Sequence, residues 1–235
     1  MGIVIAVASG KGGTGKTSVT GGVAAALAMA GQRVLCIDMD IGLRNLDISL
    51  GLSDRALMDF ADVALGRCTL SRAAVRHPDL KELSLLTAPM SLPPSLSPYR
   101  VRSMLSAART LYDYILIDAP AGLGPGFQYA VCGADRALVV ATNDASSLRD
   151  AQRVVAELDW LPQVHLVMNR IQPKLLRKLR TTIDDAMNTA GLPLIGVIPE
   201  DAQVMLCANR GIPLTSQGRK GAAMACRNIA WRLMG

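Results

Sequence analysis

The chain has 235 residues, of which 50% are apolar, 19% are charged and only 3% are aromatic. This composition supports a buried core and excludes intrinsic disorder, and the scarcity of rings argues against a module that binds nucleic acids by base stacking. The formal net charge of +6 favours an anionic partner such as a nucleotide, DNA or an acidic lipid.

The N-terminus and the cysteines indicate the cellular compartment. The first residues, Met-Gly-Ile-Val-Ile-Ala-Val, have no basic segment before the apolar run, so they predict a strand and not a signal peptide. No apolar run approaches the roughly 20 residues of a membrane span. The five cysteines are scattered and odd in number, which indicates free thiols in a reducing cytoplasm.

Short apolar runs alternate with helical segments along the chain. The predicted strands are Ile3–Ala8, Arg33–Asp38, Leu83–Thr87, Tyr114–Asp118, Ala137–Ala141, Val164–Met168 and Leu194–Val197. The predicted helices are Lys16–Ala30, Pro98–Leu111, Ser146–Leu158, Lys174–Ala190 and a last one near Gly218–Met234. Continuous Val/Ile/Leu runs are typical of strands buried on both faces. The pattern therefore predicts a single α/β domain over residues 1–235, with a doubly wound, mostly parallel sheet and helices on both faces.

A phosphate-binding loop follows the first predicted strand. The segment Gly10–Thr17 matches G-x-x-x-x-G-K-[ST], with a strand before it and a helix after it, as this motif requires. Glycines let backbone N–H groups approach phosphate oxygens, Lys16 reaches the β- and γ-phosphates, and the Thr17 hydroxyl can ligate Mg²⁺. The expected nucleotide-binding residues here are Gly10, Lys11, Gly12, Gly13, Thr14, Gly15, Lys16, Thr17 and Ser18.

Lys11 is an additional lysine at the start of this loop. A generic phosphate loop does not need it, and its position is poor for folding back onto the phosphates that Lys16 contacts. Two interpretations stay open from the residues alone. Lys11 either reaches the nucleotide of a second subunit or is a solvated loop lysine.

Carboxylates end two of the predicted strands beside this loop. Asp38 and Asp40 close the second strand, and the alternation of side chains places both on the same side. Asp118 ends the apolar run from Tyr114, where an acidic residue acts on Mg²⁺ directly or through water. Acids beside a triphosphate would repel it unless Mg²⁺ or water intervenes. A helix cap or turn residue is the alternative for Asp40.

These motifs resemble those of one known family. Lys11–Thr17 resembles the deviant phosphate loop of the ParA/MinD ATPases, and the segment Ile37–Asp47 resembles the MinD-type members. Further similar segments are Leu116–Gly122, Ser146–Asp150 and Gly196–Asp201, so the resemblance covers the whole chain. It implies an ATPase that binds Mg²⁺ with ATP or ADP, dimerises face to face around two nucleotides, hydrolyses slowly under partner stimulation, and places the division septum. ATPases that regulate flagellar number share much of the pattern.

The resemblance also implies roles for single residues. The family lysine that matches Lys11 crosses the dimer interface to the partner's phosphates, the match of Asp38 supports the Mg²⁺ shell, and the match of Asp40 orients the attacking water. The predicted catalytic residues are Lys11, Lys16 and Asp40, and the predicted metal-binding residues are Thr17, Asp38 and Asp118.

The adenine site is predicted on the same basis. The resemblance places Asn169 on the base, with Arg170, Pro199 and Glu200 around it. An Asn amide can both donate to and accept from a purine edge. A strand-end cap is the alternative for Asn169.

The sequence does not determine whether the protein acts at a membrane surface. Family members usually continue into an amphipathic membrane-targeting tail, which is not seen after the last predicted helix. In that helix the stripe Cys226, Ile229, Ala230 and Leu233 is typical of core packing, whereas Trp231 between Arg227 and Arg232 fits an interfacial anchor. We expect a cytoplasmic protein, with the inner membrane face as an alternative site, and division-inhibitor and activator proteins as partners.

A basic face on the helix predicted from Lys174 keeps a second function open. Lys174, Arg177, Lys178 and Arg180 fit a solvated surface, or contact with DNA or acidic lipid through phosphate charge. A ParA-like ATPase that positions DNA or cargo is therefore the alternative. An iron–sulfur scaffold is disfavoured because no cysteine lies between Cys68 and Cys132 to pair with the latter.

Overall fold

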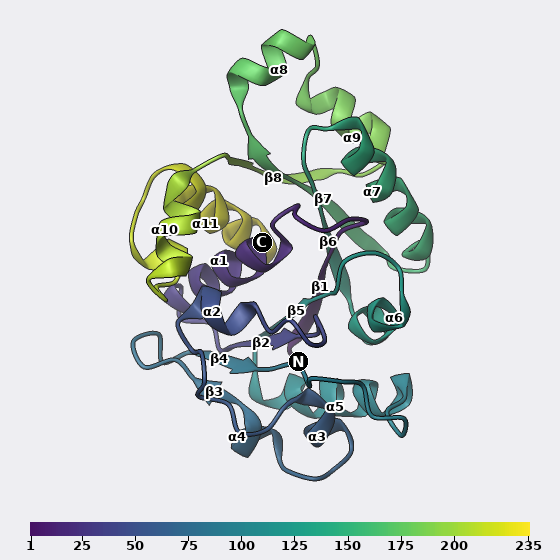
Figure 1. The fold of residues 1–235 in the computed structure, drawn as a ribbon, viewed down its shortest axis with the longest axis vertical. Helices are drawn as coiled ribbons and strands as arrows, with labels where there is room; N and C mark the ends of the chain where they lie inside the picture. The colour runs from purple at the N-terminus through teal and green to yellow at the C-terminus, as the bar shows by residue number, and fades with distance from the viewer.

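The computed structural model describes all 235 residues, which form one eight-stranded sheet flanked by helices (Figure 1). The strands are β1 (Ile3–Ala8), β2 (Val34–Asp38), β3 (Val75–Arg76), β4 (Leu83–Leu86), β5 (Tyr114–Asp118), β6 (Arg136–Ala141), β7 (Gln163–Ile171) and β8 (Leu194–Pro199). Their order in the sheet is β3-β4-β2-β5-β1-β6-β7-β8, and all pairs are parallel except β3 with β4. The predicted doubly wound, mostly parallel sheet is confirmed, and only the two-residue strand β3 was not predicted.

Eleven α-helices connect or follow the strands. They are α1 (Lys16–Met29), α2 (Leu46–Leu50), α3 (Phe60–Ala64), α4 (Leu70–Ala73), α5 (Pro98–Leu111), α6 (Pro125–Val131), α7 (Ala145–Glu157), α8 (Pro173–Leu179), α9 (Ile183–Ala190), α10 (Ala202–Asn209) and α11 (Gly221–Met234). A 3₁₀ turn, Leu214–Ser216, precedes α11. None of these helices has the length and the apolar character that crossing a membrane would require.

The prediction of one helix over Lys174–Ala190 is wrong. Arg180 adopts a left-handed conformation with φ 52° and ends α8, so it does not share the helical face of Lys174. Thr182 then starts α9 through a capping box, in which its side chain accepts from the backbone N–H of Asp185 and the carboxylate of Asp185 accepts from that of Thr182. The left-handed Arg180 and this capping box together divide the segment into two helices.

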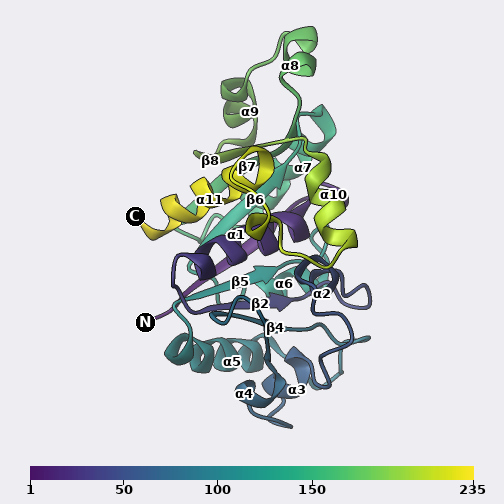
Figure 2. The same ribbon diagram turned by 90° about the vertical axis from the view of Figure 1, so that its left-hand side faces the viewer.

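Two apolar layers cover the sheet. Helices α1, α2, α10 and α11 pack on one face, and α3, α4, α5, α6, α7 and α9 pack on the other (Figures 1 and 2). Adjacent residues of β1 alternate between them, since Val4 contacts one layer and Ile5 the other. In α11 the predicted stripe of Cys226, Ile229, Ala230 and Leu233 is buried, whereas the Trp231 side chain is exposed.

The strand order determines where the phosphate loop lies. β1 runs between β5 and β6, and the loop leaves its carboxyl end to enter α1. In the sheet register, Asp118 of β5 is opposite both Val7 of β1 and Asp38 of β2. Residues from three strands are therefore brought to one sheet edge beside the loop, which is the position where open α/β sheets bind ligands.

Candidate functional site

Two glycines give the phosphate loop a backbone conformation that leaves room for a ligand. Gly13 and Gly15 have φ values of 79° and 89°, which side chains rarely adopt, and a Cβ on Gly15 would overlap Nδ2 of Asn169. Gly15 immediately precedes α1, so the helix N-terminus faces the loop. The Thr14 hydroxyl is buried and has no hydrogen-bond partner in the chain. The loop thus combines open backbone, a helix N-terminus and an unsatisfied polar atom, as an anion-binding segment does.

Lys16 lies inside this loop and is almost fully buried. Its Nζ donates to Oγ of Ser9 at 3.0 Å, and that hydroxyl donates to the carbonyl oxygen of Lys11 at 2.7 Å. Burial lowers the pKa of the Lys16 ammonium, while the nearby Asp118 and Asp40 carboxylates raise it. Ser9 was not among the predicted site residues. The available signal was a polar residue directly after a buried apolar strand.

Asp118 is a buried carboxylate that accepts hydrogen bonds from two threonines of α1. Its Oδ2 accepts from the Thr17 hydroxyl at 2.7 Å, and its Oδ1 accepts from the Thr20 hydroxyl at 3.3 Å. Burial raises the pKa of Asp118 to about 7, against the lowering effect of the Thr17 hydrogen bond. Thr20 was not predicted as a site residue either, although it lies one helical turn after Lys16.

Asp38 connects the end of β2 to the start of α2. Its Oδ1 accepts from the backbone N–H of Asp40 at 2.9 Å, and its Oδ2 accepts from that of Leu46 at 3.1 Å. Burial raises the pKa of Asp38 to about 6, while these two N–H groups lower it. Because both oxygens are engaged within the chain, the geometry fits a supporting role near a metal.

Asp40 projects from the same turn into a more open position. Its carboxylate receives no hydrogen bond from another residue, so Asp40 does not cap a helix through its side chain. Its backbone carbonyl does belong to a turn, because it accepts from the N–H groups of Leu43 and Arg44. Partial burial raises the pKa of Asp40, and the proximity of Lys16 lowers it. A carboxylate that is free of protein donors and close to the loop lysine is available to accept a hydrogen bond from water.

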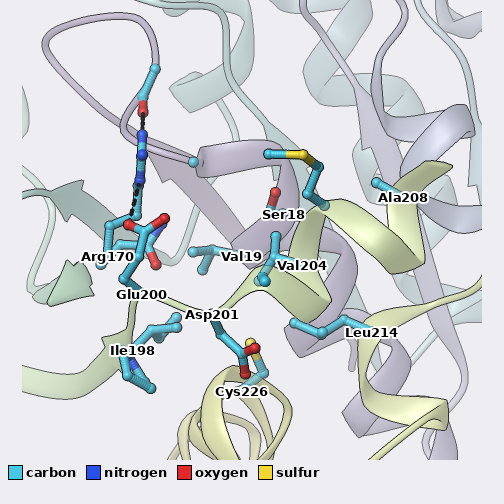
Figure 3. A pocket seen from close by; sticks show the side chains of 16 residues that line it. Ser18, Val19, Arg170, Ile198, Glu200, Asp201, Val204, Ala208, Leu214 and Cys226 are labelled. Atoms are coloured by element: carbon cyan, nitrogen blue, oxygen red, sulfur yellow. Dashed lines mark hydrogen bonds and ion pairs between the residues drawn. The ribbon is translucent and has the colours of Figure 1, made fainter. Parts of the chain in front are cut away.

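A pocket of about 330 Å³ adjoins the phosphate loop and brings together the four residues predicted for adenine. These are Asn169, Arg170, Pro199 and Glu200. Arg170 and Glu200 are seen at the pocket wall in Figure 3. Asn169 Nδ2 donates to the carbonyl oxygen of Thr14 at 2.7 Å, so one side of the amide is fixed on the loop. Apolar side chains from α1, β8 and α10 complete the walls, which suits a flat heteroaromatic ring.

Arg170 links this pocket to the phosphate loop. The pairing of β7 with β8 is irregular between Met168 and Ile171, and Arg170 has a φ of 57° there. Its Nε donates to Oε2 of Glu200 at 2.8 Å, and its Nη1 lies 3.5 Å from the Gly13 carbonyl oxygen (Figure 3). Such bulges re-aim side chains beside functional sites.

The side chain of Lys11 extends away from the phosphate site of its own loop. Its Nζ donates to Asp144 Oδ1 at 3.0 Å and to Ser146 Oγ at 2.8 Å, at the start of α7. These contacts border a groove of about 670 Å³ between the loop and α8. The Lys11 side chain is 39% exposed, so it can leave this position at small cost.

The residues present fit a nucleoside triphosphate and Mg²⁺. The loop offers unhindered N–H groups and the orphaned Thr14 hydroxyl, and Lys16 supplies a cation beside them. The structure holds no group of three or more His, Cys, Asp or Glu side chains that could bind a metal unaided. A Mg²⁺ ion in phosphate-loop proteins needs only a hydroxyl, a nearby acid and phosphate oxygens, and the pair Thr17 and Asp118 meets that need.

Comparison with known proteins agrees with this geometry. A family model described as the CobQ/CobB/MinD/ParA nucleotide binding domain matches residues 5–214. The septum site-determining protein MinD of Bacillus subtilis is 37% identical, over 100% of this chain and 90% of its own length. MinD of Helicobacter pylori is 40% identical, over 100% of this chain and 91% of its own length.

Solved structures give the same result. The MinC:MinD cell division protein complex of Aquifex aeolicus includes a chain that superposes with a TM-score of 0.92 and 37% identity, covering 99% of this chain and 96% of its own. MinD of Pyrococcus horikoshii, solved with Mg-ADP, has a TM-score of 0.86 and 28% identity, covering 99% and 96%. The resemblance seen in the sequence motifs is confirmed, and this chain belongs to the CobQ/CobB/MinD/ParA family of nucleotide-binding domains.

Proposed function

We propose that this chain is a Mg-ATP-dependent ATPase of the MinD type, formed as one domain over residues 1–235, that acts in placing the division septum. The observation that carries the proposal is the convergence of Lys16, Asp40 and Asp118 on one phosphate loop. The relatives that match the full chain are MinD proteins, which supports the biological role.

The phosphate loop and its neighbours would bind the nucleotide. The backbone N–H groups of the loop and Lys16 would hold the phosphates, and the pocket around Asn169 would hold the base. Thr17 would ligate Mg²⁺, with Asp118 and Asp38 behind it. The metal, when bound, supplies positive charge to the phosphate oxygens.

Asp40 is the residue that would act on water. Its carboxylate is free of protein hydrogen bonds and can accept one from a water molecule, which orients that water for attack. Lys16 stabilises negative charge on the phosphate oxygens in the transition state. With no second base in place, we expect slow hydrolysis that a partner protein accelerates.

Lys11 supports a dimer as the working form. Its side chain does not turn toward the phosphate site of its own loop. It lies at the edge of the groove beside α8, where its ammonium donates to Asp144. We propose that it releases Asp144 and reaches the phosphates of a second copy. The Aquifex MinD structure was solved in a MinC:MinD complex, which supports a division inhibitor as a further partner.

One surface feature favours the alternative of a DNA-positioning ATPase. Helix α8 buries none of its residues and projects from the end of the molecule (Figure 1). It carries Lys174, Arg177 and Lys178, and its Leu175 and Leu179 are 44% and 51% exposed. Sedimentation with ATP and either anionic liposomes or plasmid DNA separates the two roles. Liposome binding alone supports the MinD-type role with the membrane face as its location, and DNA binding alone supports the alternative.

Two substitutions test the proposed chemistry. Lys16→Ala should abolish ATP binding measured by calorimetry, because the cation that neutralises the β- and γ-phosphates is lost. Asp40→Ala should retain ATP binding, but its rate of phosphate release should fall by at least tenfold, since only the group that orients water is removed. Undiminished ATP affinity in the first variant, or parental turnover in the second, would contradict the proposal.

A further inference from the structure

A single carboxylate, that of Asp201, holds the first turns of two helices. Its Oδ1 accepts from the backbone N–H of Gln203 in α10 at 2.9 Å. Its Oδ2 accepts from the backbone N–H of Ala222 in α11 at 3.0 Å. Free N–H groups at a helix start need such acceptors, and Asp is among the preferred residues for this role. Asp201 therefore fastens α10 and α11 to each other at their N-terminal ends.

The start of α11 is shaped to admit this carboxylate. Lys220 occupies the N-cap position of α11, and its side chain makes no capping hydrogen bond. Gly221 follows with a φ of 56°, and a Cβ at that position would overlap Oδ2 of Asp201. The cap of α11 is thus supplied from a residue distant in sequence, which requires glycine at position 221.

Helix α10 is held in place mainly by the contacts at its ends. Cys207 is its only buried residue, so little apolar packing fixes the helix against the body of the protein. Yet α10 contributes Val204, Met205 and Ala208 to the wall of the pocket assigned to the base, and α11 contributes Cys226 (Figure 3). A shift of α10 would therefore open or close one wall of that pocket.

Asp201 itself lines the base pocket, but both of its carboxylate oxygens are engaged by backbone N–H groups of α10 and α11. We propose that Asp201 is a positioning residue for the nucleobase, which acts by fixing these two helices as the outer wall of the pocket. The inference rests on the proposed function, in which this pocket holds adenine. Asp201 makes no hydrogen bond to the phosphate loop, whose geometry depends instead on Ser9 and Asn169. Loss of Asp201 should consequently reduce the part of the binding affinity that comes from the base and ribose. The part that comes from the phosphates should be unchanged.

The test compares two ligands on the full chain. Dissociation constants for Mg-ATP and for Mg-tripolyphosphate, which has no base, are measured by calorimetry for the parent, Asp201→Ala and Asp201→Asn. We expect Asp201→Ala to weaken ATP binding about tenfold or more and to change tripolyphosphate binding less than twofold. Asp201→Asn keeps one acceptor oxygen and should fall between the parent and Asp201→Ala.

Two further variants keep the test decisive. Asp59→Ala removes another helix cap that accepts two backbone N–H groups, at the start of α3 away from the pocket, and should leave the ratio of the two affinities unchanged. Gly221→Ala displaces the Asp201 carboxylate without removing it, and should reproduce the loss for ATP if Asp201→Ala folds poorly.

The possible outcomes are distinguishable. A parental affinity ratio in both Asp201→Ala and Gly221→Ala would overturn the role of Asp201. A parent protein that binds tripolyphosphate as tightly as ATP would instead overturn the assignment of the pocket to the base, and with it this part of the proposed function.

Discussion

Two threonine hydroxyls donate to the same carboxylate, yet their surroundings differ. Thr17 approaches Asp118 from the phosphate-loop side, where its hydroxyl is half-buried and within reach of a ligand. Thr20 reaches the other oxygen of Asp118 from inside α1, where it is fully buried and its single hydroxyl proton is shared between Asp118 and the carbonyl oxygen of Lys16. The two contacts should therefore serve different purposes, one for ligand binding and one for folding.

Valine substitutions at the two threonines separate these purposes. Thr20→Val should lower the free energy of unfolding by about 1–3 kcal/mol, because a buried carboxylate loses a donor, and should leave the Mg²⁺ dependence of ATP binding intact. Thr17→Val should weaken that Mg²⁺ dependence strongly. Denaturant titration without nucleotide and calorimetry over a Mg²⁺ series measure the two effects. Equal Mg²⁺ dependence in parent and Thr17→Val would remove Thr17 from the metal site.

At the scale of elements, a buried histidine orders the connection between β3 and β4. Nδ1 of His77 accepts from the backbone N–H groups of Asp79 at 3.1 Å and Leu80 at 3.0 Å. A proton on Nδ1 would displace both donors. Burial lowers the pKa of His77 below its ordinary value of 6.5, although Asp79 opposes the shift. The neutral imidazole is thus part of the folded structure.

Stability should consequently fall as the pH falls through about 6.5. The unfolded chain takes up this proton more readily than the folded chain, so the His77 contribution is complete above pH 6.5 and decreases below it. In His77→Asn, the amide oxygen can replace Nδ1 as acceptor but does not titrate. Between pH 6.5 and 5.5 we expect the parent to lose up to about 1 kcal/mol more than this variant in denaturant titrations. Parallel pH profiles would contradict the assignment, and the other histidine, His165, is common to both proteins.

At the scale of the whole molecule, the phosphate loop lies at an accessible sheet edge beside an open groove. Lys11 and the exposed helix α8 border that groove, so a second copy approaching the nucleotide would meet both. Two triphosphates that face each other repel strongly, and each Lys11 would supply a cation where these charges meet. Such interfacial charge pairs contribute a few kcal/mol when little water is present.

Substitution of Lys11 tests the proposed dimer directly. Lys11→Ala should still bind nucleotide as a monomer, because Lys16 and the loop backbone are unchanged. ATP-dependent dimerisation should weaken by roughly a hundredfold or more. Light scattering with a slowly hydrolysed ATP analogue measures this, and Lys81→Ala, which removes an exposed lysine from the β3–β4 connection, is the charge-matched control. Dimerisation as strong as in the parent would leave Lys11 as an ordinary loop lysine.

The sequence by itself determined the phosphate loop, the seven main strands and the acids at their ends. These features are contiguous, because a loop that binds phosphates, or a strand buried on both faces, requires particular residue types at neighbouring positions. The family followed from them. The sequence also indicated Asn169, Arg170, Pro199 and Glu200 by resemblance, and the structure places all four on one pocket.

Only the tertiary structure decided which distant side chains meet. Thr20 and Asp118 are 98 positions apart, and Lys11 and Asp144 are 133 apart, so no local pattern predicts either contact. The break between α8 and α9 depended on one threonine cap, and α10 was too short for periodicity to reveal it. In the sequence Asp201 is only the last residue of a segment that resembles the family, with no role of its own. It becomes a joint between two helices because folding brings the start of α11 to within hydrogen-bonding distance of its second oxygen.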